Sequence, residues 1–189
     1  LLGQKHNASH IHLEPNAYNP FTNPQQTINY PEKSSQSQHP GLDSNFLLGK
    51  SIFTPFNFLL DISPDEQNLL SSFKSKTRYN IKLAQKKGVI VQEDNSLTAF
   101  EKYLQLTEET TKRQKFYAHT RQYHQKIWQQ MSSAGIAHLL TAKYKSEILV
   151  TWIVFKWHQT LYYPYGASTD KYKELMPSNL MMWEAIKFG

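Results

Sequence analysis

The feature that most constrains the fold is a run of three apolar segments between residues 136 and 166. They read IAHLLTAK, then EILVTWIVFKW after a tight YKS turn, then TLYYPYG after His158 and Gln159. Apolar residues fall on both faces of these segments, which is typical of strands that are covered on both sides. The chain is therefore expected to contain a sheet with its two faces buried.

Helical patterns flank this run of strands on both sides. The predicted elements are a strand at 89–93, helices at 97–115 and 120–133, and a last helix that Ser178 or Asn179 caps. This order (strand, helix, helix, three strands, helix) is the one in which an acyltransferase of the GNAT type begins. We therefore predict an α+β fold in which flanking helices cover a mixed sheet.

A strongly basic helical segment precedes these elements. Residues 74–87 read KSKTRYNIKLAQKK, in which six residues are basic and none is acidic. Helical spacing places four of the basic side chains on one ridge: Lys74, Arg78, Lys82 and Lys86. On composition alone, a solvated face and an anion-binding face fit this ridge equally. Arg78 differs from the lysines because its planar guanidinium can bind a phosphate with two hydrogen bonds.

The overall charge agrees with an anionic partner. Lysine and arginine outnumber aspartate and glutamate by 21 to 15, which gives a formal net charge of +6. The chain has no cysteine, which excludes disulfides, a thiolate nucleophile and cysteine-ligated zinc. The lack of cysteine is also compatible with a reducing compartment, so the cytoplasm is the simplest expected location. The sequence shows neither an apolar stretch long enough for a membrane span nor the pattern of a signal peptide.

Common nucleotide, nucleophile and metal signatures are missing from the sequence. We find no GxGxxG, GxxxxGK[ST], GxSxG, HExxH or EF-hand pattern. The segment HIH at 10–12 places two imidazoles on one face of a predicted strand, but no further ligand follows at a convincing spacing. We therefore predict no metal and no cofactor.

Two aromatic clusters lie at predicted element ends, where working side chains are often exposed. RQKFY at 113–117 ends a helix with Arg113 and Tyr117, and YYPYGAS at 162–168 ends a strand with Tyr163 and Tyr165 beside Gly166. Clusters of this kind more often pack in a core. The residues alone leave both interpretations open.

Five segments of the chain carry a resemblance to a known family: IHLEP, LLDISPDEQNLLSSFKSKTRYNIKLAQKKGV, TEETTKRQKF, LYYPYGAS and MPSNLMMWEAIKFG. Taken in this order, they resemble the FemA/FemB/FemX family of peptidoglycan bridge-forming aminoacyltransferases over essentially the whole chain. The most specific part matches the family's K-x-R-x-x-I-x-x-A-x-x-x-G-V run with Lys76, Arg78, Ile81, Ala84, Gly88 and Val89. A looser match is the Tyr-Gly-Ser stretch, followed by Asn179 and Trp183.

The resemblance implies parts of two GNAT-like domains. Residues 1–62 would be the C-terminal part of the first domain, 63–87 a connecting basic helical segment, and 88–189 the N-terminal part of the second domain. The implied reaction moves an amino acid from aminoacyl-tRNA to the stem peptide of a peptidoglycan precursor and forms an interpeptide bridge. A lipid-linked and a UDP-linked precursor both remain open, and peripheral contact with the inner membrane surface is compatible with either.

The resemblance also implies roles for individual residues. Arg113 matches an arginine expected to hold precursor phosphate, Tyr117 lines the same pocket, and Arg78 is expected to bind substrate in a cleft shared with Arg113. Tyr163 or Tyr165 is expected near the reacting groups, where a phenol can stabilise an oxyanion. The remaining expected contacts, to tRNA or phosphate, are Lys74, Lys82 and Lys86, since both substrates are polyanions.

The chain departs from the family pattern at both ends. Relatives have a longer N-terminal portion and continue past the last helix into a region with a lysine expected to be important for catalysis. We therefore expect a fragment that is inactive by itself.

Two alternative functions remain open. A GNAT-type N-acyltransferase would bind acyl-CoA pyrophosphate after its fourth strand, but the loop ASTDKYKELMPSN has no glycine for that purpose. A non-catalytic nucleic-acid-binding module would need exposed aromatics among the basic residues, and Tyr79 is the one candidate there.

Overall fold

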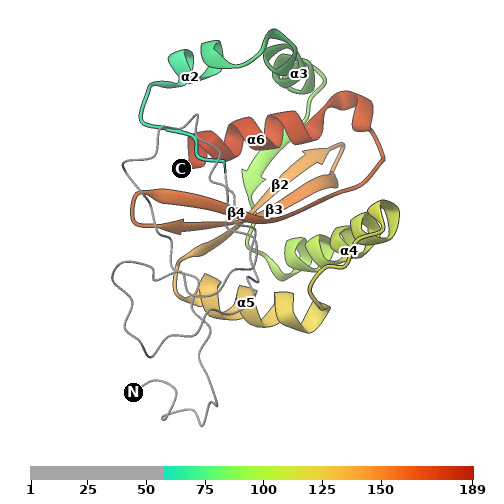
Figure 1. Ribbon diagram of the computed structural model, residues 1–189. Helices are drawn as coiled ribbons and strands as arrows, with labels where there is room; N and C mark the ends of the chain where they lie inside the picture. Colours follow the sequence, from blue (N-terminus) through green and yellow to red (C-terminus); the bar gives the residue numbers. More distant parts are fainter. Residues whose placement is uncertain (1–57) are drawn as a thin grey trace, which may run out of the picture. The chain divides into compact units, whose positions relative to one another are not determined.

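The computed structural model describes residues 58–189, and the chain divides into two units, Leu1–Leu59 and Leu60–Gly189. The elements of the second unit, in chain order, are α2 (Glu66–Ser72), α3 (Ser75–Lys86), β1 (Ile90–Glu93), α4 (Leu97–Gln114), α5 (Arg121–Ser133), β2 (Ala137–Tyr144), β3 (Glu147–Trp157), β4 (Thr160–Ser168), η1 (Lys173–Leu175) and α6 (Pro177–Phe188) (Figure 1). The predicted HIH strand lies outside the described residues. The predicted domain boundaries at residues 62 and 87 stay predictions.

The sheet contains β1 to β4 in chain order, and all three pairings are antiparallel. Lys145 and Ser146, which join β2 to β3, have φ values of 47° and 66°. Positive φ at both central residues is the geometry of a type I′ hairpin turn, which matches the twist of the two strands. Such short connections favour an antiparallel meander, so the sheet that we predicted as mixed shows only antiparallel pairings within residues 58–189.

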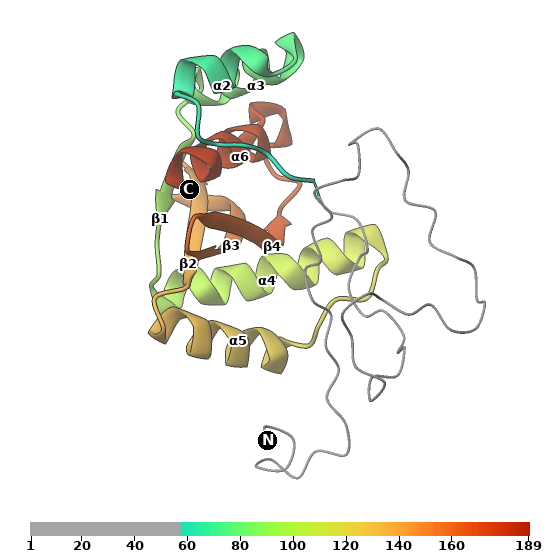
Figure 2. The ribbon, with the colours of Figure 1, turned by 60° about the vertical axis from the view of Figure 1, so that its left-hand side comes forward.

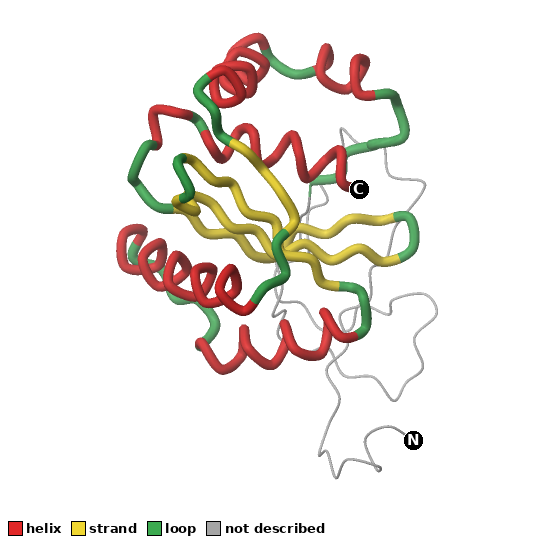
Figure 3. The backbone as a smooth tube through the Cα atoms, turned by 180° about the vertical axis from the view of Figure 1, so that it is seen from behind, coloured by secondary structure: helices red, strands yellow, loops and turns green. Residues whose placement is uncertain are grey.

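Helices cover both faces of this sheet (Figures 2 and 3). On one face, α6 packs against β1, β2 and β3, and α3 packs against α6. On the other face, α4 packs against β2, β3 and β4, and α5 packs against β2. None of the helices in residues 58–189 is long and apolar enough to cross a membrane.

Burial on both faces explains the continuous apolar run of β3. Trp152 and Val154 belong to the core that includes α3 and α6, whereas Ile153 belongs to the core that includes α4 and α5. Successive side chains of a strand point to opposite faces, so a strand covered on both sides needs apolar residues at every position. The predicted covered sheet is confirmed.

The last helix begins earlier than the sequence indicated. We predicted Ser178 or Asn179 as its N-cap, but the cap is Met176, in a left-handed conformation with φ 57°. Pro177 is the first helical residue, a position where its fixed φ is favourable and its missing N–H costs no hydrogen bond. The proline therefore sets the start of α6.

Candidate functional site

The lysines at α3 form a solvent-exposed cationic face. Lys82 and Lys86 lie in the helix, Lys74 is its N-cap, and all three are exposed. Within residues 58–189, no carboxylate forms an ion pair with any of them. This face can therefore attract a polyanion through charge.

Arg78 has a structural contact beside these lysines. Its Nη1 donates to the carbonyl oxygens of Ser71, at 3.2 Å, and of Phe73. These carbonyls belong to the end of α2, where helical carbonyls lack partners within the helix. Arg78 thus ties α2 to α3, and the part of its guanidinium that makes these bonds faces protein.

Arg113 lies in the last turn of α4 and joins that helix to the end of β4. Its Nη2 donates to the Ser168 carbonyl at 2.9 Å, and the Thr110 hydroxyl donates to the same oxygen at 3.0 Å. Its Nη1 lies 3.6 Å from a Glu109 carboxylate oxygen, and its Nε lies 3.6 Å from one of Asp170. A phosphate at Arg113 would therefore compete with two carboxylates for the guanidinium.

Arg78 and Arg113 do not share a cleft. Figure 2 shows α3 and α4 on opposite sides of the sheet, in agreement with the packing of α3 on α6 and of α4 on the strands. The expectation that the two arginines converge is wrong, because the helices that carry them cover different faces of one sheet.

A β-bulge also separates the two predicted tyrosines. Tyr163 and Pro164 together lie opposite Val154, a single residue of β3. A bulge is one of the few places in a sheet where a proline, which has no N–H to donate, is tolerated. The extra residue reverses the alternation of side chains, so Tyr163 and Tyr165 face opposite sides of the sheet instead of sharing one.

Tyr163 lies on the α6 side, against Trp152. The two rings stack with centroids 3.7 Å apart and an interplanar angle of 20°. A Cβ at Gly166 would lie 2.0 Å from the Tyr163 hydroxyl, so this ring position requires a glycine there. Although 47% of the surface of Tyr163 is exposed, desolvation of its hydroxyl raises the pKa to about 12. The phenol is therefore protonated at neutral pH and can donate a hydrogen bond.

Tyr165 lies on the α4–α5 side, in a set of five rings that we call the aromatic cluster: Tyr103, His119, Tyr123, His124 and Tyr165. The hydroxyls of Tyr165 and Tyr123 are 2.8 Å apart. His119 stacks on Tyr123 at 4.0 Å between centroids, and His124 meets Tyr165 edge-on at 5.1 Å. Burial, followed by the hydrogen bond to Tyr123, raises the pKa of Tyr165. This phenol is also protonated at neutral pH.

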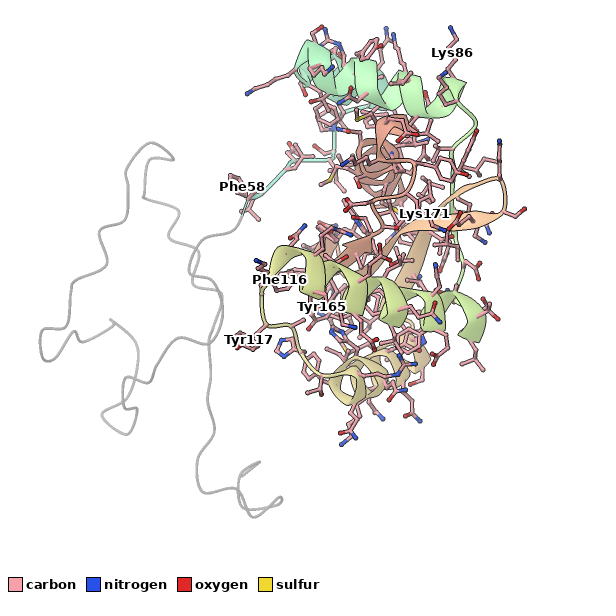
Figure 4. The ribbon with its side chains drawn as sticks, turned by 90° about the vertical axis from the view of Figure 1, so that its right-hand side faces the viewer. Phe58, Lys86, Phe116, Tyr117, Tyr165 and Lys171 are labelled. Atoms are coloured by element: carbon pink, nitrogen blue, oxygen red, sulfur yellow. The ribbon has the colours of Figure 1, made fainter. Side chains whose placement is uncertain are left out.

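A pocket of about 220 Å³ lies beside the aromatic cluster, and we call it the α4–α5 pocket. Its walls come from α4, the loop after α4 and the start of α5, and they include Thr107, Glu108, Tyr117, His119, Arg121 and His124. Phe116 and Tyr117 lie in the loop between the helices, and Tyr117 is fully exposed (Figure 4). Arg121 forms ion pairs with Glu108, at 3.3 Å, and with Glu101, so its charge is balanced. Tyr117, a predicted substrate-binding residue, therefore lies at this pocket.

His124 is the most buried polar group of this pocket, with 3% of its surface exposed. Its Nδ1 lies 2.9 Å from the hydroxyl of Tyr103, which is itself 1% exposed. Burial, and then the nearby His119, lower the pKa of His124, while burial raises that of Tyr103. Both side chains are therefore neutral at neutral pH.

Sequence reasoning gave neither His124 nor Tyr103 a role. Their sequence separation is 21 residues, so the contact depends on how α4 and α5 pack. A weaker signal was present in the spacing, because His124 precedes the buried Trp128 by one helical turn and shares its face.

Comparisons with known proteins agree with this fold. A solved structure titled "Crystal structure of FemX" superimposes with a TM-score of 0.62 at 16% sequence identity, over 67% of this chain and 48% of that one. The chain thus spans about half the length of that structure. A search of curated proteins finds no match. The predicted α+β fold of the GNAT-like class is confirmed by this similarity and by the sheet with its flanking helices.

The family itself is shown by a match to the sequence. The model of the FemAB family matches residues 2–148, which is well over half of the chain. The resemblance that the sequence motifs indicated is therefore confirmed, and this chain belongs to the FemAB family.

Proposed function

We propose that the protein with this chain is an aminoacyltransferase that moves an amino acid from aminoacyl-tRNA to the stem peptide of a peptidoglycan precursor. The observation that carries the proposal is the FemAB family match over residues 2–148. The exposed cationic face of α3 supports it, because both substrates are polyanions. A cytoplasmic location follows from the use of aminoacyl-tRNA.

The cationic face is proposed to hold the phosphodiester backbone of the tRNA through Lys74, Lys82 and Lys86. Lysine contributes as a point charge, so this contact would be sensitive to salt and independent of base sequence. Arg113 and Tyr117 are proposed to bind the precursor, with precursor phosphate replacing a carboxylate at Arg113. Arg78 is proposed to support the α3 contact from the α2–α3 junction.

In the proposed reaction, the deprotonated amine of the stem peptide attacks the ester carbonyl of the aminoacyl-tRNA. A bond from nitrogen to carbon forms, the ester bond breaks, and the tRNA hydroxyl leaves with the proton. A tetrahedral oxyanion forms on the way, and a hydrogen-bond donor next to it lowers the barrier. Tyr163 or Tyr165 is the proposed donor, since both phenols keep their protons at neutral pH. A single oxyanion would meet one of the two, because they face opposite sides of the sheet.

Transfer of label tests the proposal. The chain, and the longest open reading frame that contains it, would be incubated with radiolabelled aminoacyl-tRNA and a UDP-linked or lipid-linked muropeptide. We expect label in the muropeptide with the longer protein. Label transferred only from acetyl-CoA to an amine would support the acyl-CoA alternative instead. Binding of tRNA with no transfer from either donor would support the non-catalytic alternative.

A further inference from the structure

The solvent-facing side of α3 has an aromatic ring near its centre. The helix packs on α6, and its buried residues are Ile81 and Ala84 (Figure 2). At about 100° per residue, Tyr79 lies roughly opposite both of them. Its side chain is 58% exposed and belongs to neither hydrophobic core of residues 58–189. Amphipathic helices usually carry polar residues at such a position, so core packing does not account for this tyrosine.

Exposed lysines surround this ring along the helix. Lys76 lies one turn before Tyr79, Lys82 one turn after it, and Lys86 two turns after it. The Nζ of Lys76 lies over the ring, 5.1 Å from its centre, which is the geometry of a cation–π contact. No ion pair within residues 58–189 involves these three lysines, and α3 itself contains no acidic residue. The ring is therefore surrounded by positive charge that no carboxylate balances.

A ring between lysines fits one kind of polyanion better than others. A single exposed aromatic residue is common on protein surfaces and needs no ligand. Sites for single-stranded nucleic acid, however, combine cations that contact phosphates with rings on which bases stack. In a double helix the base faces are covered by neighbouring base pairs, so an exposed ring can stack only on an unpaired base. The pairing of ring and lysines thus indicates an unpaired strand.

The length and composition of this face agree with that occupant. Lys76 and Lys86 are ten residues apart, or roughly 15 Å along the helix axis, which is enough for a short run of nucleotides. A helix that lies on a membrane surface needs several apolar residues on its outer side. Because α3 offers one ring among lysines there, the face fits RNA better than a lipid surface.

We propose that the solvent-facing side of α3 binds an unpaired segment of RNA, with Tyr79 stacking on one base. Lys76, Lys82 and Lys86 contact the adjoining phosphates. The assignment of this RNA to the aminoacyl-tRNA rests on the proposed function. Because every base has a face on which to stack, the contact selects an unpaired strand rather than a sequence. Tyr79 is a binding residue and takes no part in bond formation.

The first test measures stacking directly in the 189-residue chain. A short oligouridine would carry 2-aminopurine at each position in turn, since the fluorescence of this base falls when it stacks. We expect the unchanged protein to quench at least one position at saturation, and added salt to reverse the effect by dissociating the complex. Saturating binding without quenching at any position would overturn the proposal, whether or not the variants described below fold.

Matched substitutions separate the ring from the charge. Tyr79→Leu should weaken binding of the oligouridine about tenfold and leave the salt dependence unchanged, because no charge is lost. Tyr79→Phe keeps the ring and should bind within about twofold of the unchanged protein. Tyr162→Leu removes an exposed tyrosine of β4 and should have no effect. The stacking role is rejected if a folded Tyr79→Leu protein binds as tightly as the unchanged one.

Lys76→Gln provides the complementary change, because it keeps the ring and removes one cation. Affinity should fall about threefold, and the slope of log affinity against log salt concentration should become less steep by about one. The same loss of slope in Tyr79→Leu would mean that the tyrosine acts on the charges and not by stacking.

Two other ligands test the choice of occupant. Tyr79→Leu should change affinity for a fully paired RNA duplex by less than about twofold, since its bases are not available for stacking. An equal tenfold loss for duplex and oligouridine would contradict recognition of an unpaired strand. Vesicles of phosphatidylglycerol and phosphatidylcholine provide the second ligand. If Tyr79→Leu weakened binding to the vesicles but not to the oligouridine, the occupant would be an anionic lipid surface and the proposal would be wrong.

This proposal and the proposed function can fail separately. Transfer from aminoacyl-tRNA by the longer protein, together with no quenching by the chain, would reject the RNA site and retain the aminoacyltransferase. Quenching that Tyr79→Leu abolishes, together with no tRNA-dependent transfer, would retain the site and reject the enzyme.

Discussion

The two sides of the central sheet use their polar groups differently. On the α3 side, three exposed lysines have no carboxylate partner within residues 58–189, and Arg78 caps a helix end. On the α4–α5 side, Arg113 and Arg121 are paired with carboxylates, and His124 and Tyr103 are buried together. Figure 4 shows Lys86 on α3 and Tyr117 in the loop after α4, far apart along the molecule.

This contrast separates two kinds of recognition. Exposed charges act over about 10 Å, are screened by salt and tolerate small displacements. Buried hydrogen-bonding groups act only in contact, and their strength depends on orientation. We therefore expect the α3 side to determine affinity for a polyanion and the α4–α5 side to determine the position of a smaller group.

The largest expected effect is a loss of tRNA affinity on charge reversal at α3. Replacing Lys74, Lys82 and Lys86 with glutamate should weaken tRNA binding about 100-fold at low salt. The slope of log affinity against log salt concentration should become less steep by about two to three. Filter binding at several salt concentrations measures both quantities.

A matched control lies on the other side of the sheet. Lys112, Lys115 and Lys126 are exposed, and changing them to glutamate alters the net charge by the same amount. We expect a change in tRNA affinity below about threefold, since these lysines are away from the proposed contact. Equal loss in the two triple variants would show that net charge matters rather than the α3 face.

The next effect is the unequal stability loss of two arginine variants. Arg113→Met breaks a bond to Ser168, 55 residues away, and should lower the free energy of unfolding by about 1–2 kcal/mol, allowing for partial exposure. Arg78→Met breaks local bonds between neighbouring helices and should cost less, about 0.5–1 kcal/mol. Urea denaturation measures both. Calorimetric titration of Arg113→Met with the UDP-linked precursor tests the proposed binding role of Arg113. If the variant bound the precursor as tightly as the unchanged protein, Arg113 would not belong to the proposed site.

A smaller difference is expected between the two tyrosines of β4. Tyr165→Phe loses the bond to the Tyr123 hydroxyl and should lower the free energy of unfolding by about 1 kcal/mol. Tyr163→Phe keeps the stack on Trp152 and should change stability by less than about 0.5 kcal/mol. Thermal and urea unfolding of the two variants measure this difference. Equal losses of stability would contradict the placement of the two tyrosines on opposite sides of the sheet.

The smallest expected effect is a pH dependence that His124 produces. Burial lowers its pKa below the unfolded value near 6.5, so the unfolded chain binds more protons just below that pH. The free energy of unfolding should therefore decrease as pH falls from 7 to 5. His124→Gln should remove this slope, whereas substitution of the exposed His158 should retain it. Urea titrations at each pH provide the measurement, and identical slopes in all three proteins would contradict it.

Much of the local structure was predictable from hydrophobic spacing. The predicted segments at 97–115 and 147–157 became α4 and β3 with nearly the same bounds. Helix starts were less predictable, because neighbouring polar residues compete as caps. Ser63 and Asp65 both precede α2, and the cap is Asp65, because its carboxylate accepts a hydrogen bond from the Asn68 N–H at 2.8 Å.

The sequence by itself determined which segments are strands and helices, the cationic character of α3 and the membership of the FemAB family, because each depends on residues close together in the chain. Only the tertiary structure decided which groups meet. The bulge that separates Tyr163 from Tyr165 arises from pairing with β3, and the contact of His124 with Tyr103 arises from the packing of α5 beside α4. Strand register and helix packing depend on residues far apart in the sequence, so no local sequence pattern predicts them.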